Sequence, residues 1–137
     1  MFKRFEVAHQ SMSPTLLPGD FLLASPSRPN PKRGEIIVFE ETEGRFIIKR
    51  IVGLEGETVL ANAGRVSVDG NVNLDRWAIG LTSPFDPITI PPGHVWALGD
   101  RRELSSLDSR SLGPIAVADC WRARIRYFPL GKIGMVR

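Results

Sequence analysis

The sequence predicts a mainly β protein with little helix. Its apolar residues occur in short alternating or β-branched runs, and turn-forming residues separate these runs. The 137 residues include 13 Gly and 11 Pro, which suits many short strands joined by turns. No amphipathic segment of helical length is found. The chain is long enough to bury one core, so we expect a single domain over residues 1–137.

In the first half of the chain the alternation is regular. Phe5 and Val7 alternate with charged residues, which predicts a first strand that runs toward Ser11. Further strands are expected at Phe21–Ala24, Gly34–Glu40, Arg45–Val52, Thr58–Ala61 and Arg65–Val68. Turns are expected at Glu41–Gly44 and Asp69–Gly70, because these segments carry the residues that tight hairpins require.

The second half is less regular. Residues 74–87 give no decisive pattern, because prolines interrupt the alternation. Strands are expected at Ile88–Ile90, Val95–Leu98 and Trp121–Phe128. Residues 101–113 are polar and rich in serine, which predicts an exposed loop with a helix cap. On the last strand, three arginines at alternating positions predict a solvated face: Arg122, Arg124 and Arg126.

Ser11 begins a stretch that suits a nucleophile. Pro14 fixes its own backbone angle and cannot donate a ladder hydrogen bond, and Pro18-Gly19-Asp20 predicts a turn before the next strand. Ser11 is therefore expected at a rigid, irregular strand end, where catalytic side chains are often exposed. Taken alone, Ser11 and Ser13 are equally well explained as turn serines.

Lys49 lies in the expected strand Arg45–Val52. Since side chains alternate across a strand, Lys49 shares one face with Ile47 and Ile51, while Arg50 is free to point outward. A lysine on an apolar face normally extends its amine to water. If it cannot, burial lowers its pKa from ~10.4 by as much as about 3–5 units, and the neutral amine can act as a general base.

Composition excludes several classes of function. Cys120 is the only cysteine, so no intramolecular disulfide forms, and the two histidines, His9 and His94, belong to no ligand-spaced cluster. We therefore expect neither metal nor other cofactor. No apolar run approaches the ~20 residues of a membrane-spanning helix. The net charge of +3 only weakly favours anionic surfaces, so no nucleic-acid partner is expected, while peripheral contact with a membrane is allowed.

Three segments together resemble the type I signal peptidases. Ser11–Leu16 resembles the nucleophile box, Ser-Met-x-Pro-Thr-Leu, and Lys49–Glu57 resembles the general-base box, Lys-Arg-x-x-Gly-x-Pro-Gly-Asp. Gly99-Asp100 followed by Ser106–Ile115 resembles the last box, with its Ser-x-Asp-Ser-Arg core. The boxes occur in the order found in the family, and Arg33–Phe39 fits the strand between the first two.

The resemblance implies a mostly antiparallel β fold and a serine endopeptidase with a Ser/Lys dyad. Such enzymes remove an N-terminal signal or leader peptide from an extended precursor after small residues, in Ala-x-Ala-like sequences. By the resemblance, Ser11 is the nucleophile, and its backbone N–H is one oxyanion donor. Lys49 is the base, Ser106 orients the lysine, and Asp108 and Arg110 form a supporting polar pair.

The sequence departs from the family pattern near each of these residues. His9 stands where many bacterial members carry a hydroxyl residue as second oxyanion donor. Either His9 replaces that donor, or the donor is weaker, or the backbone serves alone. Glu55 stands where proline is usual. The segment before Ser106 is one residue longer than usual, so Ser105 competes with Ser106 for the orienting role.

The location of the protein depends on its N-terminus. If Met1 is the native start, no membrane anchor precedes the nucleophile, and we expect a cytoplasmic or soluble enzyme. That would resemble the small soluble branch thought to trim the leader of nickel superoxide dismutase. If an anchor has been removed, the chain would resemble the membrane-associated, extracytoplasmic part of an ordinary signal peptidase.

Two other functions remain open. The self-cleaving peptidases of the SOS-repressor type share the Ser/Lys dyad, although only ten residues precede Ser11 here, which leaves little to cut. A β-rich peptide-binding module that has lost catalysis is the non-enzymatic alternative. The retention of both Ser11 and Lys49 argues against it.

Overall fold

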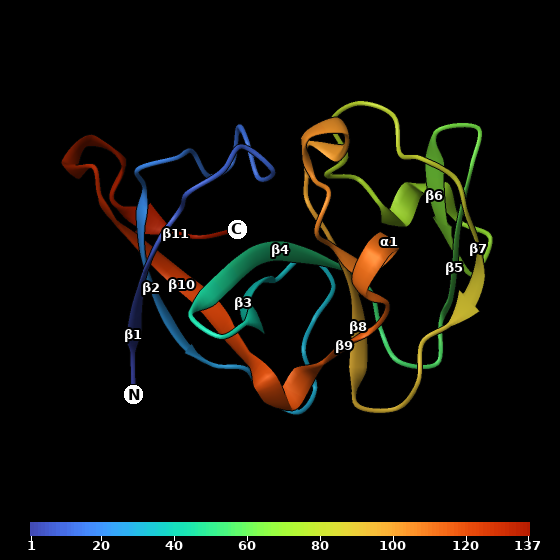
Figure 1. Cartoon of the computed structure of the whole chain (residues 1–137), viewed down its shortest axis with the longest axis horizontal. Coiled ribbons are helices and arrows are strands. Elements are labelled where there is room, and N and C mark those ends of the chain that lie inside the picture. The colour runs from blue at the N-terminus through green and yellow to red at the C-terminus, as the bar shows by residue number, and fades with distance from the viewer.

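The computed structural model describes residues 1–137 and confirms a mainly β fold with antiparallel strand pairs. An eight-stranded sheet has the order β1-β2-β10-β3-β4-β8-β9, and β11 pairs with β10. Its strands are β1 (Lys3–Glu6), β2 (Phe21–Pro26), β3 (Ile36–Thr42), β4 (Arg45–Gly53), β8 (His94–Leu98), β9 (Ile115–Ala116), β10 (Cys120–Phe128) and β11 (Gly134–Met135). Figure 1 shows β4 and β8 linking the two ends of the molecule.

A second, three-stranded sheet has the order β6-β5-β7. Its strands are β5 (Thr58–Asn62), β6 (Arg65–Val68) and β7 (Phe85–Thr89). In Figure 1 this sheet forms the right-hand end of the molecule. Its inner side chains pack against Val52 of β4 and against Trp96 and Leu98 of β8. The only α-helix is α1 (Ser109–Leu112), and no helix is long and apolar enough to cross a bilayer.

The expected strands are present, with two shifts. The strand expected at Gly34–Glu40 is β3, which begins only at Ile36. The strand expected at Ile88–Ile90 is β7, which begins at Phe85 and therefore includes Pro87. Proline is tolerated there because β7 is an edge strand, and its pairing with β5 is interrupted between Ile88 and Phe85. The β5–β6 hairpin turns at Ala63-Gly64, whose φ angles are both positive, at 54° and 83°.

The strand β4 alternates as the sequence predicts. Ile47 and Ile51 lie in a buried cluster formed by β3, β4 and β8, and Lys49 between them is only 4% exposed. The prediction that Arg50 points outward is wrong, because Arg50 is 1% exposed. The guanidinium does not need water, because the buried carboxylate of Asp100 accepts its hydrogen bonds.

The segment 101–113 is not the exposed loop that was expected. Its helix cap is present, since the Asp108 side chain accepts a hydrogen bond from the Arg110 N–H at the start of α1. However, the polar side chains of this segment turn inward, and four of them are buried: Arg102, Ser105, Asp108 and Ser109. The reason is that they bond to one another and to the backbone of β8, as in the 2.8 Å bond from the Ala97 N–H to Ser109 Oγ.

Candidate active site

Ser11 lies in a tightly packed loop between β1 and β2. Met12 and Leu16, on the same loop, are each 1% exposed and pack with Val7 and Leu22. The Leu16 N–H donates to the Met12 carbonyl at 2.9 Å, which closes a helical turn. The loop is therefore rigid, and its core contacts fix the position of the Ser11 hydroxyl.

A second contact ties this loop to the segment after β8. The Arg101 N–H donates to the Ser11 carbonyl oxygen at 2.9 Å. Gly99 makes the close approach possible, because a Cβ there would overlap the Ser105 side chain and lie 2.9 Å from the Ser11 carbonyl oxygen. Gly99 is a site residue that strand patterns did not reveal, although it is the glycine of the Gly-Asp pair in the last box.

The amine of Lys49 belongs to a buried hydrogen-bond chain. Lys49 Nζ donates to Ser105 Oγ at 3.0 Å, and Ser105 Oγ donates to Asp108 Oδ2 at 2.6 Å. Burial lowers the pKa of the Lys49 ammonium to about 8, although the charge of Asp108 opposes the change. Lys49 is thus positioned by a neutral hydroxyl, and its amine is largely deprotonated in mildly alkaline solution.

The expectation that Ser106 orients the lysine is corrected, because the structure places Ser105 there. Ser105 is 6% exposed, whereas Ser106 is exposed and lines the outer groove. The Ser106 carbonyl accepts a hydrogen bond from Ser111 Oγ at 2.9 Å, and Lys49 Nζ bonds to Ser105 rather than to Ser106. The additional residue before Ser106 thus shifts the contact by one position.

Asp108 and Arg110 form the ion pair that the sequence suggested. Arg110 Nε donates to Asp108 Oδ1 at 3.0 Å, and Arg110 Nη2 lies 2.9 Å from Oδ2. Burial alone would raise the pKa of Asp108, but hydrogen bonds from Arg110 and Ser105 hold that pKa below its usual value. Asp108 is therefore an anion, and it fixes the Ser105 hydroxyl as a donor that presents its lone pairs to Lys49.

Arg50 and Asp100 form a second buried pair, which was not foreseen. Arg50 Nε and Nη2 donate to the two carboxylate oxygens of Asp100 at 2.9 and 2.8 Å. Arg50 follows Lys49, and Asp100 follows Gly99, so the pair clamps β4 against the end of β8. In the sequence, this pair could have been suspected because Arg50 directly follows Lys49 and Asp100 directly follows Gly99 in two of the motif segments.

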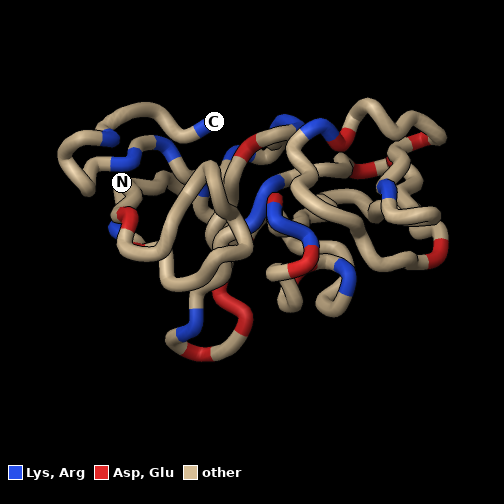
Figure 2. The backbone as a smooth tube through the Cα atoms, turned by 90° about the horizontal axis from the view of Figure 1, so that it is seen from above, with Lys and Arg blue, Asp and Glu red and all other residues tan.

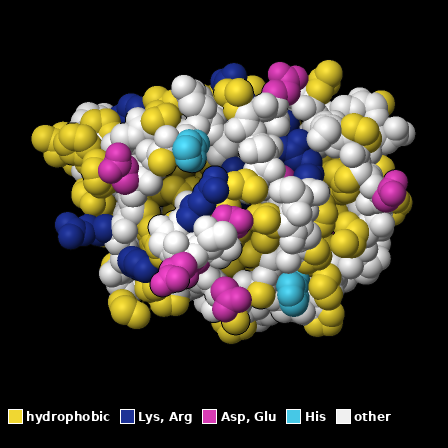
Figure 3. Space-filling model, in the orientation of Figure 1, with side chains coloured by type: hydrophobic (Ala, Val, Ile, Leu, Met, Phe, Trp, Pro, Cys, Tyr) yellow, Lys and Arg dark blue, Asp and Glu magenta, His cyan; other side chains and the backbone are white.

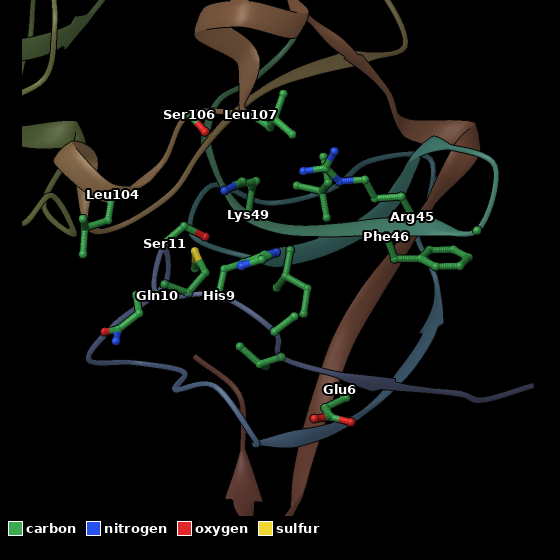
Figure 4. Close-up of a pocket in the computed structure, with 16 residues that line it drawn as sticks. Glu6, His9, Gln10, Ser11, Arg45, Phe46, Lys49, Leu104, Ser106 and Leu107 are labelled. Atoms are coloured by element: carbon green, nitrogen blue, oxygen red, sulfur yellow. The ribbon is translucent and has the colours of Figure 1, made fainter.

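The Ser11 hydroxyl and the Lys49 amine meet at one groove of about 700 Å³. Residues 6–12 form one wall and residues 44–49 form the other, with Leu104, Ser106 and Leu107 at the end (Figure 4). The structure contains no group of three or more His, Cys, Asp or Glu side chains that could hold a metal ion. The groups available for chemistry are the Ser11 hydroxyl, the Lys49 amine with its lowered pKa, and the free N–H of Ser11.

Two further donors border Ser11. The Ser11 N–H makes no hydrogen bond within the chain, so it is free to bind an anionic oxygen. The exposed His9 ring also lines the groove and makes no hydrogen bond (Figure 4). Both expected oxyanion donors therefore lack a hydrogen-bond partner within the chain, and both lie close to the nucleophile in sequence.

Comparison with known proteins assigns the family. The model described as signal peptidase, peptidase S26, matches residues 1–128. Signal peptidase I of Leptolyngbya laminosa is 32% identical, covering 93% of this chain and 70% of the relative. Signal peptidase I P of Bacillus subtilis subsp. natto is 31% identical, covering 81% and 67%.

A solved structure agrees with these sequence matches. The crystal structure of a signal peptidase I from Enterococcus faecalis V583 aligns with a TM-score of 0.53 and 28% identity, covering 66% of this chain and 92% of that one. The shared feature is the fold of mostly antiparallel sheets. The chain therefore belongs to the signal peptidase family, peptidase S26, and is a serine-type peptidase.

Proposed function

We propose that this protein removes N-terminal signal or leader peptides from precursor proteins, with residues 1–137 acting as one catalytic domain. The observation that carries the proposal is the buried chain Lys49–Ser105–Asp108, which ends at the same groove as Ser11. A lysine that is held by a neutral hydroxyl and has a pKa of about 8 can serve as a base without histidine or metal.

In the proposed reaction, neutral Lys49 takes the Ser11 proton while Ser11 Oγ attacks the scissile carbonyl carbon. The resulting ammonium returns that proton to the leaving amine, the C–N bond breaks, and Ser11 remains acylated. Lys49 then takes a proton from a water molecule, which hydrolyses the ester and releases Ser11. Ser105 acts as a positioning residue, since its hydroxyl keeps the Lys49 amine oriented through both steps.

The tetrahedral oxyanion requires donors that are free before the reaction. We assign one donor to the Ser11 N–H, which has no partner within the chain. We assign the second to the His9 ring, which replaces the hydroxyl found in many relatives and lines the same groove. An uncharged His9 donates through one ring nitrogen, so its tautomer decides whether it can serve.

The groove favours an extended peptide. Residues Arg45–Lys49 of β4 pair with β3 on one edge only, because the pairing with β8 begins at Arg50, so the other edge is open to a peptide backbone. The groove walls carry apolar side chains near Ser11, such as Val7, Ala8 and Met12, which suit apolar residues near the cut. We therefore propose cleavage after Ala-x-Ala-like sequences. A peptide library with a preference for basic or large aromatic residues at the cut would contradict this specificity.

We also propose peripheral contact with a membrane, through an apolar patch at one end of the molecule. The patch consists of exposed side chains of β10, β11 and the turn between them: Ile125, Phe128, Leu130, Ile133 and Met135. Figure 3 shows hydrophobic side chains gathered at the end where Figure 1 places this turn. Apolar patches of this kind mark membrane or protein contacts on many proteins.

The experiment compares four proteins on a fluorogenic Ala-x-Ala peptide: wild type, Ser11→Ala, Lys49→Met and the control Ser13→Ala. Ser13 is buried in the same loop but makes no side-chain hydrogen bond, so its variant should keep near-normal turnover. The Ser11 and Lys49 variants should each lose activity, and the losses should not add in the double variant. An active-site acylating probe should label Ser11 in wild type and in Ser13→Ala, but neither the Ser11→Ala nor the Lys49→Met protein. Absence of labelling and cleavage in wild type would indicate a binding module instead.

A further inference from the structure

A second cavity, of about 400 Å³, shares no lining residue with the groove. Lys49 borders the groove, whereas the adjacent Arg50 borders this cavity, because successive side chains of β4 point to opposite faces. The turn that contains Gly34 forms one wall of the cavity, Trp77 forms another, and β10 closes it. The cavity is therefore separate from the site assigned to peptide cleavage.

The wall of this cavity is strongly basic. Eight of its residues are lysine or arginine, and Glu35 is the only acidic residue that lines it. Glu35 is already shared by two of these arginines, with Arg28 at 2.6 Å and Arg122 at 3.0 Å. Figure 2 shows several Lys and Arg positions on the segments around the C-terminal end of the chain, which borders the cavity.

Part of this positive charge has no carboxylate partner. Lys32, Arg76 and Arg124 make no ion pair, and the Arg124 guanidinium donates only to Ser25 Oγ, at 3.3 Å. In the same cavity Arg50 Nη2 donates to the main-chain oxygen of Arg137, the last residue, at 3.4 Å, so an oxygen acceptor already lies there. Like charges in a concave wall repel one another and focus a positive potential. A bound anion would reduce this repulsion.

We infer that this cavity binds a phosphate-bearing anion with at least two negative charges. The planar guanidinium groups present paired N–H donors that match phosphate oxygens. The Trp77 ring is already in contact with cations, since the guanidinium carbons of Arg50 and Arg76 lie 5.1 and 5.0 Å from its centroid. The chemistry recognised is therefore the phosphoryl group, carried either by a free compound or by a lipid headgroup.

Pyrophosphate is the probe, and isothermal titration calorimetry at low ionic strength is the measurement. Wild type should bind one pyrophosphate per chain. Arg76→Gln/Arg124→Gln should bind it at least about tenfold more weakly, because each arginine supplies a charge-assisted hydrogen bond. The matched control is Arg65→Gln, an exposed arginine of β6 outside the cavity, which should bind like wild type. If wild type shows no saturable binding, or if Arg65→Gln weakens it equally, the inference is overturned.

The test is independent of peptide cleavage. The Ser11→Ala protein should bind pyrophosphate like wild type, so an error in the catalytic assignment leaves this result unchanged. If the double variant fails to fold by circular dichroism, Arg76→Gln alone carries the test, since Arg76 is exposed. An unchanged affinity in that folded variant would overturn the inference.

Vesicles distinguish the two sources of phosphate. If the natural ligand is a lipid, pyrophosphate should release the wild-type protein from phosphatidylglycerol vesicles, and Arg76→Gln/Arg124→Gln should reduce that binding relative to Arg65→Gln. If the ligand is a free compound, pyrophosphate should bind in solution while the vesicle-bound fraction does not change.

Discussion

Replacing Lys49 by Met should inactivate the protein and stabilise it at neutral pH. Met is unbranched like Lys and only one atom shorter, and it carries no charge that must be desolvated. The pKa of Lys49 is lowered from 10.5 to about 8 by burial. At about 1.4 kcal/mol per pKa unit, keeping the ammonium in the fold costs about 3 kcal/mol below pH 8.

The sign of the pH dependence follows from the direction of this shift. Between pH 8 and 10.5 the unfolded chain binds more protons at Lys49 than the folded chain, so wild-type stability rises with pH across this window. Lys49→Met lacks this contribution. The advantage of the variant, about 3 kcal/mol at pH 7, should therefore shrink as the pH approaches 10.

Activity should follow the same titration in wild type. With a pKa of about 8, about a tenth of Lys49 is neutral at pH 7, roughly 300-fold more than for an unshifted lysine. The kcat/KM of peptide cleavage should therefore rise about tenfold per pH unit below pH 8 and level off above it.

Three measurements check this reasoning. Urea unfolding of wild type and Lys49→Met at several pH values gives the stability difference, and a pH profile of kcat/KM gives the kinetic pKa. NMR titration of the Lys49 amine in Ser11→Ala gives the pKa directly. An NMR value at or above that of free lysine, or a stability difference that does not change with pH, would refute the account.

Three further changes test the surroundings of the site. Ser105→Ala should lower kcat by about 10- to 100-fold through loss of the hydrogen bond to Lys49, while the matched Ser106→Ala should cut peptide almost normally; the reverse order would restore Ser106 as the orienting residue. Asp100→Asn should lower the free energy of unfolding in urea by about 3–5 kcal/mol, because it leaves the Arg50 guanidinium buried without its counter-charge. Gly99→Ala should reduce turnover of the same peptide, since its Cβ would displace the Ser105 side chain; normal turnover would show that this approach is not needed.

The sequence predicts β strands and the buried lysine well because both depend on local alternation. Lys49 between Ile47 and Ile51 is forced onto the core face once the strand forms. The Arg50–Asp100 pair depends instead on the register between β4 and β8, where Arg50 lies opposite Leu98, and alternation within one strand does not determine that register.

Local sequence patterns do not decide between Ser105 and Ser106 either. Both serines fit the motif, and the three-dimensional path of an irregular segment decides which one faces the lysine. The basic cavity could not be predicted from the sequence, because its walls come from five separate segments of the chain. The narrower resemblance to a maturation protease for nickel superoxide dismutase stays a prediction, because it concerns the substrate rather than the fold.

The position of β10 in the large sheet has a consequence for biosynthesis. This strand comes from residues 120–128, yet it lies between β2 and β3, which are made much earlier. Until residue 128 has left the ribosome, β10 cannot pair with β2 and β3. The strand pair β3–β4, which carries Lys49, is then not joined to the strands β1 and β2 on either side of Ser11. The nascent chain should thus be unable to cleave peptides until β10 has emerged and paired with β2 and β3.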